Sequence, residues 1–354
     1  MSDLKKYIDK YGDIKFNEEK LNEIDIAIFT QLTYINFGVV KDKLRLNNAI
    51  KKINEGKLCK KRRYQNLINA LLDKRRYKNL ILSNYVYKLT DDEQFGALCI
   101  DINSDTRLVL FEGTDDMLIG WEEDFAMSYN DLIPAEIDAI KYLNRVSKDY
   151  KNIIVAGHSK GGRIAIVSVI YSSPLTKFKI KSIYSLDGPG IGEKENLFRY
   201  KLIKNKYVKF MPRYSIFGRL FRENHKSIIV DCKDKGILAH QPFSWKIVDK
   251  QFKRSEISNS SEAFYINFNK WLDKYSFEER KYFSDYLFSI FRDMKVYSLY
   301  DLRKLNKEKY DVLLNIVKNK DEKFVNMFKE FFEFYKEYFI VTTKNKVSNL
   351  INNK

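Results

Sequence analysis

A serine flanked by glycines is the feature of this sequence best suited to chemistry. Gly157 and Gly161 lie two positions on either side of Ser159, a β-branched run (152–156) precedes them and a small-residue run (163–171) follows. This order of strand, tight turn and helix strains the backbone at the serine and leaves room only for hydrogen at the two glycines. The spacing predicts that Ser159 is a nucleophile. The alternative is an ordinary tight turn with an unreactive serine.

A serine hydroxyl is a weak nucleophile and needs a base, ordinarily a histidine that a carboxylate orients. The sequence has 3 histidines. His158 precedes the nucleophile, so its side chain must point away from the reacting face, and we interpret it as structural. His225 lies in a charged segment and is interpreted as a surface residue. His240 lies in a loop after the expected strand 227–231 and is the predicted base, with a plain loop histidine as the alternative.

The orienting acid is predicted from its place at the end of a strand. Asp187 follows the expected strand 180–186, so the chain order is serine, acid, histidine, as in α/β-hydrolases. The Gly-Pro-Gly that follows Asp187 is also an ordinary turn sequence, which leaves a turn aspartate as the alternative. Asp231 and Asp234 are the reserve candidates.

An oxyanion hole needs two donors aimed at the developing negative charge. The first is predicted to be the amide of Lys160, the residue after the nucleophile, and the second the amide of Gly113 or Thr114 in the loop after an earlier strand. Two interpretations of the Lys160 side chain stay open. It either adds positive charge near the site or points to solvent.

The elements that must position these residues follow from the hydrophobic pattern. Between residues 95 and 248, short β-rich runs alternate with helical or loop segments, which predicts an α/β sheet. The turn 103–105 predicts an antiparallel hairpin between strands 95–102 and 107–112. The other strands are expected at 152–156, 180–186, 207–211 and 227–231.

Helical regions are expected before and after the sheet segment in the sequence. Residues 4–82 show apolar residues at helical spacing between Leu21 and Ile35, which predicts an amphipathic helix. From Ser255 onward the sequence has no glycine or proline and shows an aromatic stripe from Phe264 to Tyr275, which we interpret as core rather than a cofactor site. Residues 276–279 predict a capping box. We therefore expect a helical segment at 1–90, a hydrolase core at 91–250 and a helical region at 251–354.

Composition limits the class of protein. An apolar content of 44% in 354 residues supports a sizeable core, which excludes disorder of the whole chain. The apolar stretches are far shorter than the ~20 residues of a bilayer helix, and no apolar export segment follows the charged N-terminus, so a cytoplasmic location is expected. The 3 cysteines lie too far apart for a metal or disulfide pattern and are expected to be buried, reduced thiols. No metal or organic cofactor is expected.

Positive charge is concentrated in one segment. The net charge is +17, and residues 41–78 carry fourteen Lys or Arg against three acidic residues, a net +11. A solvated helical face is one interpretation, and contact with an anionic membrane surface or substrate is the other. Nucleic-acid binding is a weaker interpretation, because no recognised motif accompanies the charge.

Three motifs lie at residues 111–114, 120–124 and 157–162. In that order they resemble the F-R-G-T, W-x-x-D and G-H-S-x-G-G motifs of the fungal-type class 3 lipases. The Mbeg-like branch of bacterial α/β-hydrolase proteins is similar also at 186–190, 215–218 and 240–245, and the resemblance runs from about Glu23 to Leu287. It implies an α/β-hydrolase fold with a mostly parallel central sheet.

Two departures from the lipase pattern bear on the site. Class 3 lipases carry their acid after the strand expected here at 207–211, but residues 212–215 contain no carboxylate. The Leu-Asp context of Asp187 instead resembles pancreatic-type lipases, which supports Asp187 as the acid. In addition, Glu112 stands where these lipases usually have an arginine, and Lys160 stands where they usually have a neutral residue.

These features predict a serine hydrolase of carboxylic esters with Ser159, Asp187 and His240 as its triad and a small-molecule or lipid-like ester as its substrate. The alternative is a non-catalytic α/β-hydrolase scaffold that binds a ligand or a protein partner. The aromatic and basic run 198–221 is expected to cap the pocket, which would favour an acyl chain joined to an anionic head group.

Overall fold

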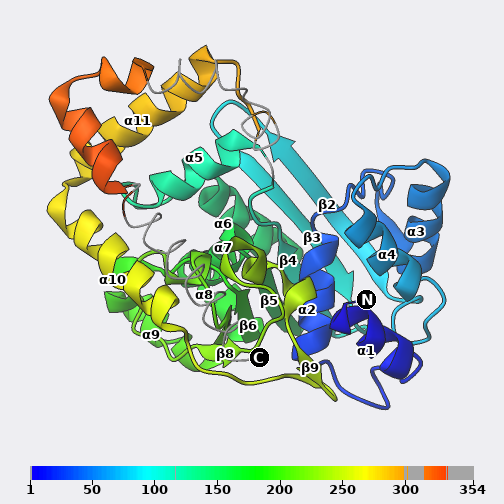
Figure 1. Ribbon diagram of the computed structural model, residues 1–354. Coiled ribbons are helices and arrows are strands. Elements are labelled where there is room, and N and C mark those ends of the chain that lie inside the picture. Colours follow the sequence, from blue (N-terminus) through cyan, green and yellow to red (C-terminus); the bar gives the residue numbers. More distant parts are fainter. Residues whose placement is uncertain (1, 116, 299–300, 302–314, 332, 334–354) are drawn as a thin grey trace, which may run out of the picture.

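The computed structural model describes residues 2–115, 117–298, 301, 315–331 and 333 of the chain (Figure 1). Over these residues, eight strands form one sheet in chain order, and the last five of them run parallel. The strands are β1 (Lys43–Arg45), β2 (Ile81–Leu89), β3 (Gln94–Asp101), β4 (Thr106–Phe111), β5 (Asn152–His158), β6 (Ile180–Leu186), β7 (Tyr207–Pro212) and β8 (Ile228–Val230). The α/β class expected from the alternation of elements is therefore confirmed.

The parallel strands end at a common edge, and this edge positions the site. Phe111 at the end of β4 is level with Gly157, His158 with Leu186, and Leu186 with Phe210. The loops that leave β4, β5 and β6 therefore start side by side. Open α/β sheets bind ligands at this carboxyl edge.

The antiparallel strands β1 to β4 confirm one prediction and contradict another. β3 and β4 form the hairpin expected around residues 103–105, with Asp101 opposite Arg107. β2, however, lies in a region expected to be helical. Its pairing with β3 shifts between Ser83 and Val86, and Asn84 has a φ of 54°. This bulge interrupts the two-residue alternation by which a strand is identified.

Helices cover both faces of the sheet. α2 (Glu23–Leu32) lies on one face, and α6 (Pro134–Val146) and α7 (Lys160–Tyr171) lie on the other. β4 contributes Leu108 and Leu110 to the first face and Val109 and Phe111 to the second. The expectation of an amphipathic α2 is wrong, because residues 24–32 are all buried. α2 is enclosed by the sheet on one side and by α1 (Asp3–Tyr11) and α4 (Arg62–Leu71) on the other.

The basic segment 41–78 forms β1, α3 (Leu46–Glu55) and α4 next to α2 (Figure 1). Its last turn is fixed by Arg76, whose guanidinium donates to both carboxylate oxygens of Asp25 in α2. Lys51, Lys52 and most other cations of the segment are exposed.

The C-terminal helices α10 (Asn259–Lys274) and α11 (Phe277–Asp293) pack beside α5 (Leu118–Ala126). Trp271 of α10 contacts both Phe125 and Phe283, so the aromatic stripe is core as expected. Ser276 and Glu279 form the predicted capping box. The remainder of the helical region expected at 251–354 falls largely outside the described residues, and the division at residues 90 and 250 stays a prediction.

Within the described ranges, we find no helix with the length and apolar character needed to cross a bilayer. The same ranges contain no cluster of three or more His, Cys, Asp or Glu that could hold a metal ion. Cys99 and Cys232 are buried thiols as expected, whereas Cys59 is half-buried.

Candidate active site

Ser159 lies at the turn between β5 and α7, in a backbone conformation that residues other than glycine rarely adopt. Its φ and ψ are 59° and −134°. A Cβ at Gly157 would lie 2.1 Å from the carbonyl oxygen of Gly161, and one at Gly161 would lie 2.3 Å from that of Phe111. Any side chain at either glycine would thus collide with backbone. The strain at Ser159 is held by this packing, and strained backbone of this kind is typical of functional sites.

Asp187 and His240 meet at the carboxyl edge of the sheet. The Nδ1 atom of His240 is 2.6 Å from the Asp187 carboxylate oxygen Oδ2. The other oxygen, Oδ1, accepts hydrogen bonds from the Ser215 hydroxyl and, at 3.1 Å, from the backbone N–H of Gly218. Asp187 is fully buried and has a φ of 51°. The segment 215–218 thus holds the carboxylate in place against the imidazole.

His240 lies at the end of the 3₁₀ helix η4 (Gly236–His240), with little of the residue exposed. The ring of Phe217 covers it at a centroid distance of 4.2 Å. Because a carboxylate only accepts, His240 donates from Nδ1, which leaves a lone pair on Nε2. Within the described part of the chain, neither His240 Nε2 nor the Ser159 hydroxyl makes a hydrogen bond.

His158 holds the His240 loop against the turn that contains Ser159. Its Nε2 is 2.9 Å from the backbone oxygen of His240, and its Nδ1 is 2.7 Å from the Tyr34 hydroxyl. A carbonyl oxygen only accepts, so Nε2 carries the proton and Nδ1 accepts from Tyr34. Burial, together with the neighbouring His240, lowers the pKa of His158 well below its usual value. Both ring nitrogens are occupied, which agrees with a structural role for this residue.

His225 is not the surface residue expected from its charged neighbours. It is half-buried, its ring contacts that of Tyr207 at a centroid distance of 4.4 Å, and its Nδ1 lies 3.3 Å from the Tyr200 hydroxyl. Burial lowers its pKa. Its contacts lie with residues before and within β7, near the opposite edge of the sheet from Ser159.

The loop after β4 packs directly against Ser159. A Cβ at Gly113 would lie 2.8 Å from the Cβ of Ser159 and 2.3 Å from the Tyr34 hydroxyl. Burial raises the pKa of the Tyr34 hydroxyl well above its usual value. Next to it, the Thr114 hydroxyl donates to Asp124 Oδ2 at 2.6 Å. The loop is therefore fixed on both sides, through Tyr34 of the α2 region and Asp124 of α5.

Lys160 follows neither of the two interpretations made for its side chain. Its Nζ atom is buried and lies 2.8 Å from Glu123 Oε2 and 3.0 Å from the backbone oxygen of Gln94. The ammonium group is thus neutralised by an ion pair inside the protein. The backbone N–H of Lys160, by contrast, lies in the first turn of α7, where no helical acceptor exists for it.

Two acidic groups near the loop are buried. Burial raises the pKa of Asp124 to about 6, and it raises that of Glu112 well above the usual range. The Glu112 carboxyl lies over Gly96, where an added Cβ would be 2.0 Å from Oε2. Glu112 therefore favours its uncharged form.

The sequence did not indicate the supporting residues Tyr34 and Phe217 in any functional role. Tyr34 lies just beyond α2 with no motif around it, and only its contact with His158 reveals it. Phe217 belongs to the segment 215–218 that the family resemblance included, which was the one available signal. The expected cap formed by residues 198–221 is wrong, because β7 runs through the middle of this segment as an interior strand of the sheet.

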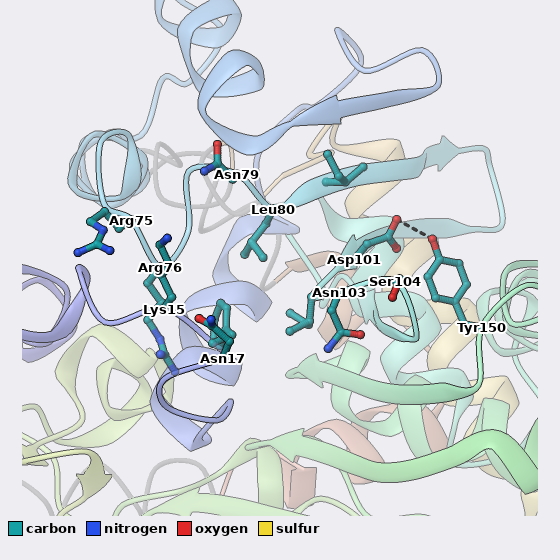
Figure 2. A pocket seen from close by; sticks show the side chains of 13 residues that line it. Lys15, Asn17, Arg75, Arg76, Asn79, Leu80, Asp101, Asn103, Ser104 and Tyr150 are labelled. Carbon is teal, nitrogen blue, oxygen red and sulfur yellow. Dashed lines mark hydrogen bonds between the residues drawn. The ribbon is translucent and has the colours of Figure 1, made fainter.

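A pocket of about 580 Å³ lies away from these residues (Figure 2). It is lined by parts of 15–17, 75–81 and 101–104 and by Tyr150, whose hydroxyl donates to Asp101 at 2.7 Å. Residues 101–104 lead into the start of β4, whereas Ser159 follows the end of β5. The pocket is therefore at the opposite edge of the sheet and does not belong to the Ser159 site.

Comparisons with known proteins give one family. A family model described as Mbeg1-like matches residues 71–289, which is more than half of the chain. Among curated proteins, none matches the sequence. Among 6 matching chains of solved structures is one described as "Crystal structure of M37 lipase". It is 13% identical, with a TM-score of 0.33, and the match covers 55% of this chain and 69% of the other. That similarity is too low to support a functional statement.

Proposed function

The chain belongs to the Mbeg1-like family, and we propose that it is a serine hydrolase of carboxylic esters. The observation that supports this best is the 2.6 Å contact between His240 Nδ1 and the Asp187 carboxylate, beside a serine whose φ is 59°. An imidazole oriented by a carboxylate and a serine on a tight strand-to-helix turn are two of the parts from which serine hydrolases are built. The substrate is a small-molecule or lipid-like ester, and the protein acts in the cytoplasm.

In the proposed mechanism, His240 Nε2 removes the proton from the Ser159 hydroxyl while Ser159 Oγ attacks the ester carbonyl carbon. The electron pair of the carbonyl moves to its oxygen, which the amides of Lys160 and of Gly113 or Thr114 stabilise. The Gly113 backbone lies against Ser159, since a Cβ there would be 2.8 Å from the Ser159 Cβ, and Thr114 follows it directly.

The tetrahedral intermediate then breaks down. The bond to the alkoxy group breaks, and His240 gives the proton to the departing alcohol, which leaves an acyl group on Ser159. A water molecule, deprotonated by His240, attacks the acyl carbon and releases the carboxylic acid with Ser159 restored. No step requires a metal ion or an organic cofactor.

The mechanism requires one contact beyond those described above, between Ser159 Oγ and His240 Nε2. Both atoms lack hydrogen bonds within the described residues, so neither must give up a partner to form it. Catalytic hydrogen bonds often tighten only when substrate binds. The missing hydrogen bond between the Ser159 hydroxyl and His240 is also the observation that favours the second candidate function. This is a non-catalytic scaffold that binds a ligand or a protein partner.

A panel of esters and thioesters separates the two functions. We expect turnover by the wild-type protein and by Ser104→Ala, a control at an exposed turn, and at least a thousandfold loss in Ser159→Ala. Equal absence of turnover in all three folded proteins would favour the scaffold. Turnover that survives in Ser159→Ala would show that another residue performs the reaction.

A further inference from the structure

Three large apolar side chains stand out on the surface. Among the described residues, the most exposed are Phe178 at 85%, Leu175 at 80% and Phe198 at 73%. They lie on two short helices, α8 (Pro174–Lys179) and α9 (Phe198–Lys201), and Leu202 directly after α9 is also exposed. Scattered apolar residues are normal on a protein surface, but a cluster of such strongly exposed ones marks an interaction site.

Basic residues surround these apolar side chains. Segments 174–181 and 197–206 contain no Asp or Glu and have seven cations, which are Lys177, Lys179, Lys181, Arg199, Lys201, Lys204 and Lys206. Within the described residues, none of the seven forms an ion pair. Lys177 and Lys179 donate to the backbone oxygens of Ser172, Ser147 and Lys148, whereas the other five side chains make no hydrogen bond within the described residues. No described carboxylate neutralises the seven cations, and those five are available to an anionic partner.

The two segments form one surface. α8 leads into β6, α9 leads towards β7, and β6 and β7 pair directly. The Arg199 guanidinium lies 6.0 Å from the ring centroid of Tyr171, three residues before α8. Burial and the charge of Arg199 lower the pKa of Lys177. Arg199 of one segment thus lies near Lys177 of the other.

We propose that this surface, formed by residues 174–181 and 197–206, docks the protein on an anionic lipid bilayer. Exposed Phe and Leu enter the boundary between headgroups and acyl chains, while the surrounding Lys and Arg attract the anionic headgroups. The basic segment 41–78 is a poorer candidate. It has more charge but only one exposed large apolar side chain, Leu58.

The docking surface is separate from the ester-cleaving site and does not rest on the proposed function. α8 precedes the start of β6, whereas Ser159 lies level with its end. A strand of seven residues is about 20 Å long, so the docked protein holds Ser159 at least that far from the contact. Hydrolysis of water-soluble substrates is therefore independent of docking.

Flotation with lipid vesicles tests the surface, using the full-length protein. Wild type is expected to bind vesicles of phosphatidylcholine with 30% phosphatidylglycerol, about tenfold more strongly than vesicles of phosphatidylcholine alone. Leu175→Ser/Phe178→Ser and Lys201→Glu/Lys204→Glu are each expected to lower this binding about tenfold. Ile266→Ser/Phe277→Ser is the apolar control, and Lys51→Glu/Lys52→Glu in α3 is the charge control. Both should bind like wild type.

Several outcomes would overturn the proposal. They are no binding by wild type, unchanged binding by both surface variants, or an equal loss in the controls. If the wild type binds a DNA duplex but not vesicles, and the surface variants lose the DNA binding, the partner of this surface is nucleic acid and the lipid proposal is wrong. If a surface variant fails to fold, Phe178→Trp offers an independent test, because its fluorescence should shift to the blue on anionic vesicles. An unshifted spectrum would contradict insertion.

Discussion

The carboxylate of Asp187 lies 2.6 Å from His240 Nδ1, although 53 residues separate the two along the chain. Its other oxygen is held by Ser215 and by the Gly218 amide. An acid fixed in this way sets the tautomer of the imidazole and leaves Nε2 free to act as a base. The pair therefore connects the fold to the proposed chemistry.

Asp187→Asn should lower kcat about 10⁴-fold, because the amide favours the wrong histidine tautomer. Asp231→Asn is the matched control, since Asp231 pairs with Lys246 and Lys253 and not with a histidine. Steady-state hydrolysis of an active ester from the panel measures both. Similar losses in the two variants would contradict the assignment of Asp187.

Tyr34→Phe should weaken the support of the loops that contain Gly113 and His240. The substitution removes the hydroxyl that donates to His158 Nδ1 and leaves that buried nitrogen unpaired. We expect the free energy of unfolding to fall by about 1–3 kcal/mol, with a lower kcat. Tyr297→Phe, at an exposed tyrosine, should change neither quantity in urea unfolding and ester assays. An unaffected Tyr34→Phe protein would show that this network has no role.

The ion pair of Lys160 should be structural. Lys160→Met leaves the buried Glu123 carboxylate without its cation, and we expect a loss of about 3–5 kcal/mol in the free energy of unfolding. Adding Glu123→Gln should recover part of that loss. In comparison, Lys151→Met breaks an exposed pair with Asp105 and should cost less than about 1 kcal/mol. A mild effect of Lys160→Met would place its ammonium group in solvent instead.

Asp124 should make stability depend on pH. Burial raises its pKa in the folded protein to about 6, so between about pH 4 and 6 the folded state holds a proton that the unfolded state has released. This contribution to stability is present at low pH and is lost as the pH rises through 6. Asp124→Asn removes it, so the variant should gain on the order of 2–3 kcal/mol relative to wild type between pH 4 and pH 7. A pH-independent difference in urea unfolding would refute this.

Local patterns predicted the parts of the fold and site that depend on neighbouring residues. The strand 180–186 has the expected bounds, and the capping box at Ser276 is present, because short-range spacing determines both. The glycines around Ser159 likewise reflect backbone contacts within one turn. The Asp187 and His240 assignments needed chain order and the elimination of other histidines, since nothing local connects them.

Long-range contacts account for what the sequence did not predict. Lys160 pairs with Glu123 through the tertiary fold, so its spacing could not distinguish a buried ion pair from a solvated charge. The contact of His158 with the His240 carbonyl joins segments 82 residues apart. β2 was missed because the bulge at Asn84 breaks its alternation.

Labelling with a fluorophosphonate tests the central claim most directly, because the reagent reacts fast with a serine that a neighbouring base activates and slowly with ordinary serines. Peptide mass spectrometry of the folded, full-length protein should find the label on Ser159, with labelling strongly reduced in Asp187→Asn. An unlabelled wild-type protein, or a label on a different serine, would contradict the assignment of Ser159 as the nucleophile.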